Sequence, residues 1–266
     1  MDREQILSCL GDHRWKDRVV VLDSVDSTNN LAKELARKGA WEGSAFIADR
    51  QSAGRGRLGR SFLSPAGVGI YFSMVLRPGC PPQELMHLTC AVGSAMCDAV
   101  ERACGFRPGI KWTNDLVVGS KKLGGILTEL SVNPATHLVD FAIVGIGINC
   151  RQQEADFDES IRHMACSAEM VTGRPIDRSR LAAEMIRALS EMNDRLLSDK
   201  AALLDDYRRD CITLGREISV VRGLNIRHGV ARSVDEDGAL VVDYDDGTSE
   251  AVSSGEVSIR GLYGYV

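Results

Sequence analysis

The sequence predicts an α+β protein, in which a mixed, largely antiparallel sheet packs with helices and a small β domain follows. Between residues 109 and 148, strand-like runs are separated only by short turn-forming pairs such as Asn133-Pro134. Such turns connect antiparallel neighbours. After Leu214, five short strand-like runs follow one another, and this density is typical of a small closed barrel or sandwich. We therefore expect one domain over residues 1–211 and a second over residues 212–266.

The separate elements follow from hydrophobic periodicity and from the residues that begin and end helices. Asp26-Ser27-Thr28 precedes an amphipathic helical pattern that stops at Gly39, and such residues commonly cap a helix at these positions. Apolar residues recur at helical spacing over residues 83–104 and again from Asp177 to Leu196. We expect strands at residues 45–48, 69–76, 109–112, 116–118, 122–130 and 138–148.

Composition excludes several classes of protein. Of the 266 residues, 44% are hydrophobic and 26% are charged, which excludes a fully disordered chain. No apolar run approaches the roughly 18 residues that a membrane span needs, and residues 1–5 do not resemble a secretory signal. A net charge of −5 argues against a duplex-DNA-binding role. We expect a cytoplasmic protein with neither a membrane nor a DNA partner.

The eight cysteines do not form a metal-binding pattern, because no C-x-x-C pair occurs. Cys90, Cys97 and Cys104 recur every seven residues and would lie on one helix face. Seven helical residues rise about 10 Å, which is too far for two thiolates to share one zinc ion. We interpret these cysteines as buried small hydrophobic residues, reduced as in a cytoplasmic protein, and expect no metal ligands.

The segment of residues 51–60 combines glycines with arginines at positions 55, 57 and 60. Glycines let backbone amides approach an anion closely, and arginines add charge and fork-shaped donors, which suits a polyphosphate. It is not a Walker loop, because no Gly-Lys-Ser/Thr follows. The alternatives are a solvated flexible loop or a segment that binds RNA nonspecifically. Because little apolar surface is available, we expect the loop to be mobile without ligand and to close over one.

Three later segments each allow a functional and a structural interpretation. Residues 111–115 end a strand with Asn114 and Asp115, which either act at a sheet edge or only make a turn. Residues 121–129 place lysines before two glycines, which indicates either close approach of a ligand or a plain hairpin. Residues 145–149 hold Gly-x-Gly before an amide, and no Rossmann-type helix follows.

In their order along the chain these segments resemble the biotin protein ligase family, from about Val19 onward. The C-terminal residues 215–260 resemble the terminal SH3-like domain of that family. The resemblance implies a two-step ligase. The biotin carboxylate attacks the α-phosphate of MgATP to give biotinoyl-5′-AMP and pyrophosphate, and a lysine amine of a biotin carboxyl carrier protein then displaces AMP. The implied small molecules are biotin, ATP and Mg²⁺.

The resemblance also implies roles for individual residues. Lys122, Arg57 and Asp115 would be catalytic: Lys122 would bridge the biotin carboxylate and the α-phosphate, and Asp115 would accept a proton or help hold magnesium. The implied biotin-binding residues are Ser27, Thr28, Asn29, Gln51, Gly54, Arg55, Gly56, Arg57, Lys122 and Gly125. The implied nucleotide-binding residues are Arg57, Arg60, Phe62, Asn114, Lys122, Asn149 and Arg260.

Two positions depart from the usual family pattern: Phe62 replaces the commoner Trp, and Thr113 replaces Pro. Only 26 residues precede Ser27, too few for a winged-helix domain, so a monofunctional ligase without DNA binding is implied. A lipoate ligase or octanoyltransferase is the nearest alternative, and a noncatalytic nucleic-acid-binding protein is the alternative from another class. By analogy, the sheet edge at residues 138–148 could pair in a homodimer.

Overall fold

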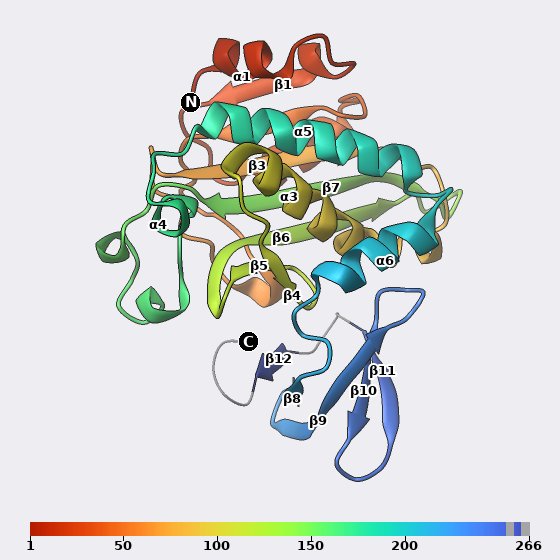
Figure 1. The fold of residues 1–266 in the computed structure, drawn as a ribbon. Coiled ribbons are helices and arrows are strands. Elements are labelled where there is room, and N and C mark those ends of the chain that lie inside the picture. Colours follow the sequence, from red (N-terminus) through yellow and green to blue (C-terminus); the bar gives the residue numbers. More distant parts are fainter. Residues whose placement is uncertain (254–257, 262–266) are drawn as a thin grey trace.

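The computed structural model describes residues 1–253 and the backbone of residues 258–261. The first part of the chain builds a seven-stranded sheet in the order β1-β2-β3-β7-β6-β5-β4 (Figure 1). β1 and β2 are parallel, with α2 between them in sequence, and the other neighbours are antiparallel. The strands are β1 (Val19–Leu22), β2 (Ala45–Ala48), β3 (Gly69–Leu76), β4 (Gly109–Lys111), β5 (Asp115–Val118), β6 (Lys121–Val132) and β7 (Val139–Asn149).

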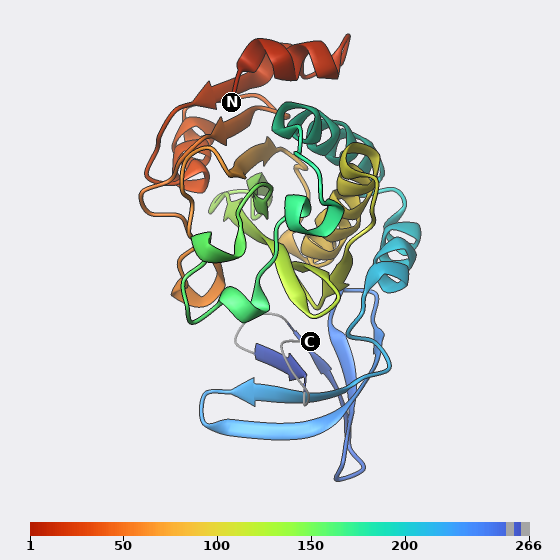
Figure 2. The same cartoon turned by 60° about the vertical axis from the view of Figure 1, so that its left-hand side comes forward.

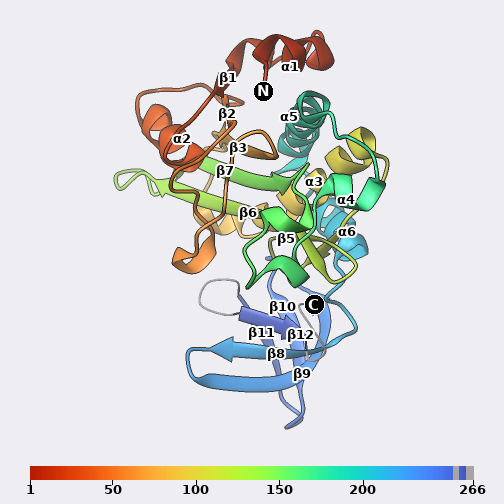
Figure 3. The same cartoon turned by 90° about the vertical axis from the view of Figure 1, so that its left-hand side faces the viewer.

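Helices cover both faces of this sheet, with α2 on one side and α3 and α5 on the other (Figure 3). The helices are α1 (Arg3–Leu10), α2 (Thr28–Arg37), α3 (Leu88–Cys104), α4 (Ala168–Thr172), α5 (Arg178–Arg195) and α6 (Lys200–Asp210). Short 3₁₀ turns join them, among them Arg57–Gly59, Pro82–Leu85 and Arg162–Met164.

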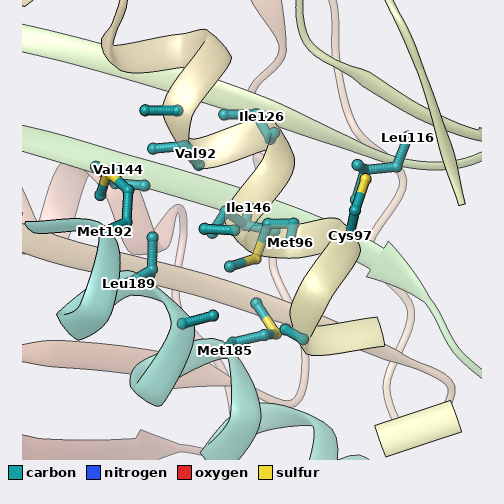
Figure 4. Close-up of a cluster of buried hydrophobic side chains, with 14 of the residues drawn as sticks. Val92, Met96, Cys97, Leu116, Ile126, Val144, Ile146, Met185, Leu189 and Met192 are labelled. Carbon is teal, nitrogen blue, oxygen red and sulfur yellow. The ribbon is translucent and has the colours of Figure 1, made fainter. Parts of the chain in front are cut away.

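The larger core lies between the sheet and the α3–α5 layer. Met96 on α3 and Met185 on α5 point toward Ile146 on β7 (Figure 4), and all three side chains are buried. On the other face, Ala36 of α2 packs with Phe141 and other apolar residues of the sheet. Burying such side chains contributes about 1.5–3 kcal/mol each, so both faces hold the central strands β3, β7 and β6 in place.

The predicted fold class is confirmed, and several elements agree closely. Ala45–Ala48 and Gly69–Leu76 are strands with the predicted bounds, and Asp177 caps α5 by accepting from the amides of Ser179 and Arg180. The helix predicted over residues 83–104 is wrong at its start, because Pro82–Leu85 is a 3₁₀ turn and α3 begins at Leu88. Apolar spacing does not distinguish a 3₁₀ turn from the first turn of an α-helix. The helices α1, α4 and α6 and the strand β1 were not predicted.

The sheet edge expected at residues 138–148 is not an edge. β7 lies between β3 and β6 and pairs with both along its length. That prediction was wrong because the periodicity of a strand does not reveal its lateral position in a sheet. β5 pairs only with residues 121–125 of β6, so residues 127–132 have no neighbouring strand on their outer side in the described part of the chain.

The C-terminal part, coloured blue in Figure 2, forms a five-stranded antiparallel sheet, which confirms the predicted small β domain. The order of its strands is β11-β10-β9-β8-β12. Its strands are β8 (Glu217–Arg222), β9 (Asn225–Val234), β10 (Leu240–Tyr244), β11 (Ser249–Val252) and β12 (Ser258–Gly261). The boundary near residue 212 stays a proposal, since the Ile212 amide still donates to the Ile110 carbonyl of β4 at 2.9 Å.

All eight cysteines are free thiols, and all except Cys9 are buried. Burial raises the pKa of Cys104 to about 11, so this thiol stays protonated and packs as a small hydrophobic group. The described residues contain no group of three or more His, Cys, Asp or Glu side chains that could hold a metal ion. No helix within that part of the chain is long and apolar enough to cross a membrane.

Candidate active site

A cavity of about 610 Å³ lies where the start of α2, the loop of residues 51–62 and the strands β5, β6 and β7 meet. This volume is in the range of sites for small molecules and cofactors. The cavity brings together side chains that are far apart in the sequence. Of the predicted site residues, Ser27, Thr28, Asn29, Gln51, Arg55, Gly56, Arg57, Arg60, Phe62, Asn114, Asp115, Lys122 and Gly125 line it.

One end of the cavity carries neutral polar groups in a fixed hydrogen-bond network. Gln51 accepts at Oε1 from the Thr28 amide (2.9 Å) and from Thr28 Oγ1 (3.0 Å). Its Nε2 donates to Ser64 Oγ at 2.8 Å, and Ser73 Oγ lies 2.6 Å from Asn29 Oδ1. Because Thr28 begins α2, the helix orients these donors and acceptors together. Ser64 and Ser73 carried no signal in the sequence, since both are ordinary strand or loop residues.

The glycines of β6 and β7 make room for side chains from other elements. A Cβ at Gly145 would lie 2.0 Å from Asn29 Oδ1, and a Cβ at Gly147 would lie 2.6 Å from the Phe62 ring. A Cβ at Gly125 would lie 3.3 Å from Lys122 Nζ. These glycines therefore admit side chains that line the cavity, and close approach of a ligand to them stays a prediction.

The loop of residues 51–60 is fastened over the cavity at two points. Arg55 donates through Nη1 and Nη2 to the Glu129 carboxylate, both at 3.1 Å, and Arg57 Nη1 donates to Asn114 Oδ1 at 2.9 Å. Directly after Arg57, Leu58 has φ +55°, ψ +36°, a left-handed conformation that costs a non-glycine residue about 1–2 kcal/mol. Strain of this kind persists only where surrounding contacts hold the backbone.

Glu129 was missed by the sequence analysis, although it lies at the centre of this fastening. Besides Arg55, its carboxylate accepts from Asn29 Nδ2 at 3.0 Å and pairs with Lys33 Nζ at 3.4 Å. Burial alone would raise the pKa of Glu129, but the hydrogen bonds from Asn29 and Arg55 outweigh it, and the pKa lies below its usual value. Alternation along β6 places Gly125, Leu127 and Glu129 on one face, which is the signal that could have found it.

The other end of the cavity is strongly positive. The basic side chains that line the whole cavity in the described part of the chain are Arg55, Arg57, Arg60, Lys111 and Lys122, and Asp115 is the carboxylate among the lining residues. Arg55 lies nearer the neutral end, because its partner Glu129 also accepts from Asn29. Lys122 Nζ donates to Asp115 Oδ1 at 2.6 Å. Burial lowers the pKa of Arg57, and the neighbouring charge of Asp115 opposes this effect. A guanidinium stays charged regardless, so this end attracts anions.

Some predicted residues lie outside the cavity. Asn149 is buried, donates from Nδ2 to the Cys166 carbonyl (3.1 Å) and accepts from Gln152 (3.1 Å). Gly54 lies at the base of the loop, where a Cβ would be 2.3 Å from the Phe62 carbonyl oxygen. Both fix the walls of the site, and their ligand contacts stay predictions.

Arg260 lies on β12, and its side chain is outside the described residues. Conversely, Phe72, His163 and Met164 line the cavity without having been predicted. His163 and Met164 lie on the 3₁₀ turn Arg162–Met164. No motif marks that turn in the sequence.

Comparison with known proteins finds matches to both parts of the chain, the one that holds the cavity and the C-terminal one. Residues 21–149 match the Biotin/lipoate A/B protein ligase family, and residues 213–260 match the Biotin protein ligase C terminal domain. The chain is 32% identical over 234 residues to the bifunctional ligase/repressor BirA of Bacillus subtilis, covering 87% of this chain and 71% of that protein. It is 32% identical over 228 residues to the biotin--[acetyl-CoA-carboxylase] ligase of Paracoccus denitrificans, covering 84% and 92%.

Among solved structures, the biotin protein ligase from Aquifex aeolicus in complex with biotin and ATP matches with a TM-score of 0.77 and 31% identity. That match covers 91% of this chain and 98% of the Aquifex chain. The identity over most of both chains, together with the two matching domains, shows that this chain belongs to the biotin protein ligase family.

Proposed function

We propose that this chain is an ATP-dependent biotin protein ligase. It forms biotinoyl-5′-AMP from biotin and ATP and transfers the biotinoyl group to one lysine of a biotin carboxyl carrier protein. The observation that carries the proposal is the division of the cavity. Neutral hydrogen-bonding groups around Thr28 and Gln51 occupy one end, and cationic groups around Arg57 and Lys122 occupy the other. Biotin has the matching polarity, with a neutral ureido ring at one end and a carboxylate at the other.

The ureido ring offers two N–H donors and one carbonyl acceptor, all of them uncharged. Hydroxyl and amide side chains complement such a ring without adding net charge. Ser27, Thr28 and Gln51 line the cavity and are buried or half-buried, so each hydrogen bond would form away from water. Gly125 also lines the cavity, and the absence of a side chain there leaves space for the ring system.

The chemical step brings together two anions, the biotin carboxylate and the α-phosphate. The carboxylate oxygen forms a bond to phosphorus while the bond to the pyrophosphate oxygen breaks. Positive groups that are already in place lower such a barrier, because they need no reorganisation as charge shifts. Lys122, held by Asp115 at 2.6 Å, and Arg57, held by Asn114 at 2.9 Å, are two such groups. In the second step the lysine amine attacks the anhydride carbonyl, and AMP leaves.

Magnesium enters this proposal as part of the substrate MgATP. The described residues contain no group of three or more His, Cys, Asp or Glu side chains that could hold a metal ion. Mg²⁺ bound to a nucleotide usually takes its ligands from phosphates, water and one or two carboxylates. Asp115 is the carboxylate that lines the cavity and would serve if the ion contacts the protein.

The lipoate ligase alternative differs at the neutral end of the cavity. The dithiolane ring of lipoate has no N–H or C=O groups, so it could make none of the hydrogen bonds that a ureido ring would make with the polar groups at this end. The nucleic-acid-binding alternative needs arginines that face an open surface. Here Arg55 pairs with Glu129 and Arg57 with Asn114 at the cavity, which favours a small anionic ligand.

The protein surface and the thiols bear on partners and location. The outer side of β6 over residues 127–132 lies close to the cavity and has backbone groups without a neighbouring strand in the described chain. An added strand, either from the carrier or from a second copy of this chain, would extend the sheet there. Eight unpaired cysteines suit the reducing conditions of the cytoplasm.

Biotin transfer tests the proposal directly. The purified protein is incubated with biotin, MgATP and the biotin carboxyl carrier domain of an acetyl-CoA carboxylase, and the mass of the carrier is measured. We expect one biotinoyl group per carrier. None should form without ATP, none on a carrier in which the acceptor lysine is replaced by arginine, and none when lipoate replaces biotin. An unmodified carrier under the complete conditions would contradict the proposal.

A further inference from the structure

Trp112 lies between the cavity and the C-terminal sheet. Its side chain lines the cavity and is 5% exposed. The indole Nε1 donates to the carbonyl oxygen of Gly238 at 3.0 Å, in the turn between β9 and β10. The Trp112 amide donates to Thr213 Oγ1 at 2.9 Å, in the segment that leads into that sheet. One cavity residue is therefore held from the C-terminal side through both its side chain and its backbone.

The turn that supplies the Gly238 carbonyl is itself rigidly built. Asp235 Oδ1 accepts from the amides of Asp237 (2.9 Å) and Ala239 (2.8 Å). From α6, Arg208 donates to the Val234 carbonyl at 2.9 and 2.7 Å, and Lys200 Nζ pairs with Asp237 at 2.8 Å. Because Arg208 and Lys200 of α6 bond residues on both sides of Gly238, the position of the Gly238 carbonyl is fixed relative to the first domain.

Gly238 approaches α3 so closely that a side chain does not fit. A Cβ there would lie 2.9 Å from Cys90 Sγ and 3.4 Å from His87 Cα. The residue also has φ +82°, a conformation that favours glycine. Cys90 Sγ donates to the same Gly238 carbonyl at 3.8 Å. Any added side chain would therefore push the turn away from α3 and from Trp112.

The segment that Trp112 begins carries two residues of the cationic end. Asn114 accepts from Arg57, and Asp115 accepts from Lys122. Between them and Trp112, the Thr113 carbonyl accepts from Tyr207 on α6 at 3.4 Å. A displacement of Trp112 by a fraction of an ångström would pass to the partners of Arg57 and Lys122 through only two or three residues of backbone.

We propose that Gly238 is a positioning residue for the active site: its carbonyl holds the Trp112 indole, and through it the Asn114-Asp115 segment that orients Arg57 and Lys122. The inference rests on the proposed function, because it concerns adenylation of biotin. It gives the C-terminal sheet a positioning part in the first step, through a backbone carbonyl rather than a charged side chain.

The chain offers a closely matched control for a test at Gly238. Gly247, in the turn between β10 and β11, also has φ +82°, but nothing lies within 4 Å of its added Cβ. Gly238→Ala and Gly247→Ala therefore impose the same backbone strain, and only the first displaces a neighbour. For biotin-dependent ATP–pyrophosphate exchange, we expect Gly238→Ala to lower kcat about tenfold, as loss of preorganisation does. We expect Gly247→Ala to stay within about twofold of the unmodified protein.

A spectroscopic readout follows Trp112 without depending on activity. In a chain carrying Trp15→Phe and Trp41→Phe, Trp112 is the remaining tryptophan. We expect Gly238→Ala, but not Gly247→Ala, to shift its fluorescence emission to longer wavelength, because the indole loses its buried partner and meets water. Trp112→Phe, which keeps a ring and removes the N–H donor, should lower kcat of exchange to a similar extent as Gly238→Ala.

The outcomes separate this inference from the proposed function. If the unmodified protein shows no biotin-dependent exchange, the proposed function fails, and the fluorescence comparison still tests the Gly238–Trp112 contact. Unchanged kcat and unchanged emission in folded Gly238→Ala would overturn the inference. If Gly238→Ala does not fold, the Trp112→Phe variant tests the inference instead. A folded Trp112→Phe with the kcat of the unmodified protein would overturn the inference, and a roughly tenfold loss of kcat supports the inference.

Discussion

The pairing of Glu129 with Arg55 makes the most specific prediction about the loop of residues 51–60. Glu129→Gln keeps the size of the side chain and an oxygen that can accept from Asn29 Nδ2, but it removes the charge that holds Arg55 and Lys33. Arg57 and Asn114 remain as the second fastening of the loop. The variant therefore loosens one end of the loop and leaves the other intact.

The size of the effect follows from the geometry of the pair. Two N–H···O bonds of 3.1 Å join Arg55, whose side chain is 41% exposed, to Glu129, which is 16% exposed. For a bidentate pair with one partner in water we take about 1 kcal/mol, the upper end of the range for exposed pairs. Since 1.4 kcal/mol corresponds to a factor of ten, the open population of the loop should rise about fivefold.

Limited trypsin digestion measures this population, because cleavage after Arg55, Arg57 or Arg60 requires an open loop. When opening and closing are fast relative to cleavage, the rate follows the open fraction. Without ligand, Glu129→Gln should be cut in the loop about fivefold faster than the unmodified protein. A nonhydrolysable biotinoyl-AMP analogue should slow cleavage in both, if the loop closes over ligand.

Glu34→Gln is the matched control, because Glu34 pairs with Lys38 on the exposed side of α2 and does not touch the loop. It should be cut at the rate of the unmodified protein. If Glu129→Gln is cut no faster than Glu34→Gln, the Arg55–Glu129 pair does not hold the loop, and this reasoning is wrong.

Three further predictions concern the cavity. Lys122→Ala should lower the rate of biotin-dependent ATP–pyrophosphate exchange at least a hundredfold while changing the biotin Kd only a few-fold, because the lost charge acts mainly in the transition state; equal exchange rates would refute this role. Gly147→Ala should raise the KM for ATP several-fold, because its Cβ would displace the Phe62 ring, and an unchanged KM would argue against Phe62 as a nucleotide contact. Arg57→Ala should release biotinoyl-AMP into solution during turnover, measurable by chromatography, and retention as in the unmodified protein would contradict a closing role.

The lowered pKa of Glu129 predicts how this network depends on pH. Burial would raise the pKa, but hydrogen bonds from Asn29 and Arg55 bring it below the usual 4.5. A carboxylate with a lowered folded-state pKa stabilises the protein fully above its unfolded pKa and loses that stabilisation as the pH falls through the folded value. In urea unfolding at pH 7, the free energy of unfolding of the unmodified protein should therefore be larger than that of Glu129→Gln. This difference should become smaller as the pH falls below 4.5. A difference that does not change with pH would assign the effect to packing.

Local sequence patterns predicted most strands, because the alternation of residues and the turn residues at the ends of a strand are set by residues close together in the sequence. β2 and β3 are apolar runs bounded by turn residues, and their bounds follow directly. The lateral order of strands depends on tertiary packing, so the central place of β7 was not predictable from periodicity. The helix α6 was missed because six acidic or basic side chains within Lys200–Asp210 obscure its apolar face, of which Leu203, Leu204 and Tyr207 are buried.

In the candidate site too, some residues were predicted from the sequence and others were not. The resemblance named Thr28, Gln51 and Lys122, and the fold brings them to one cavity. Glu129 and Gly238, which hold Arg55 and Trp112, were not named, because they are distant in sequence from their partners: 74 positions separate Arg55 from Glu129, and 126 separate Trp112 from Gly238. Pairs at such separations are set by the packing of whole elements, which no local pattern records.

ATP–pyrophosphate exchange with biotin as the variable component tests the central claim most directly. The purified protein is incubated with MgATP and labelled pyrophosphate, with biotin, with lipoate or with neither, and the label in ATP is measured. Adenylation of biotin in the cavity predicts rapid exchange with biotin and only background exchange in the other two mixtures. Exchange that is equally fast with lipoate, or that needs no added acid, would contradict the claim that this chain is a biotin-activating ligase.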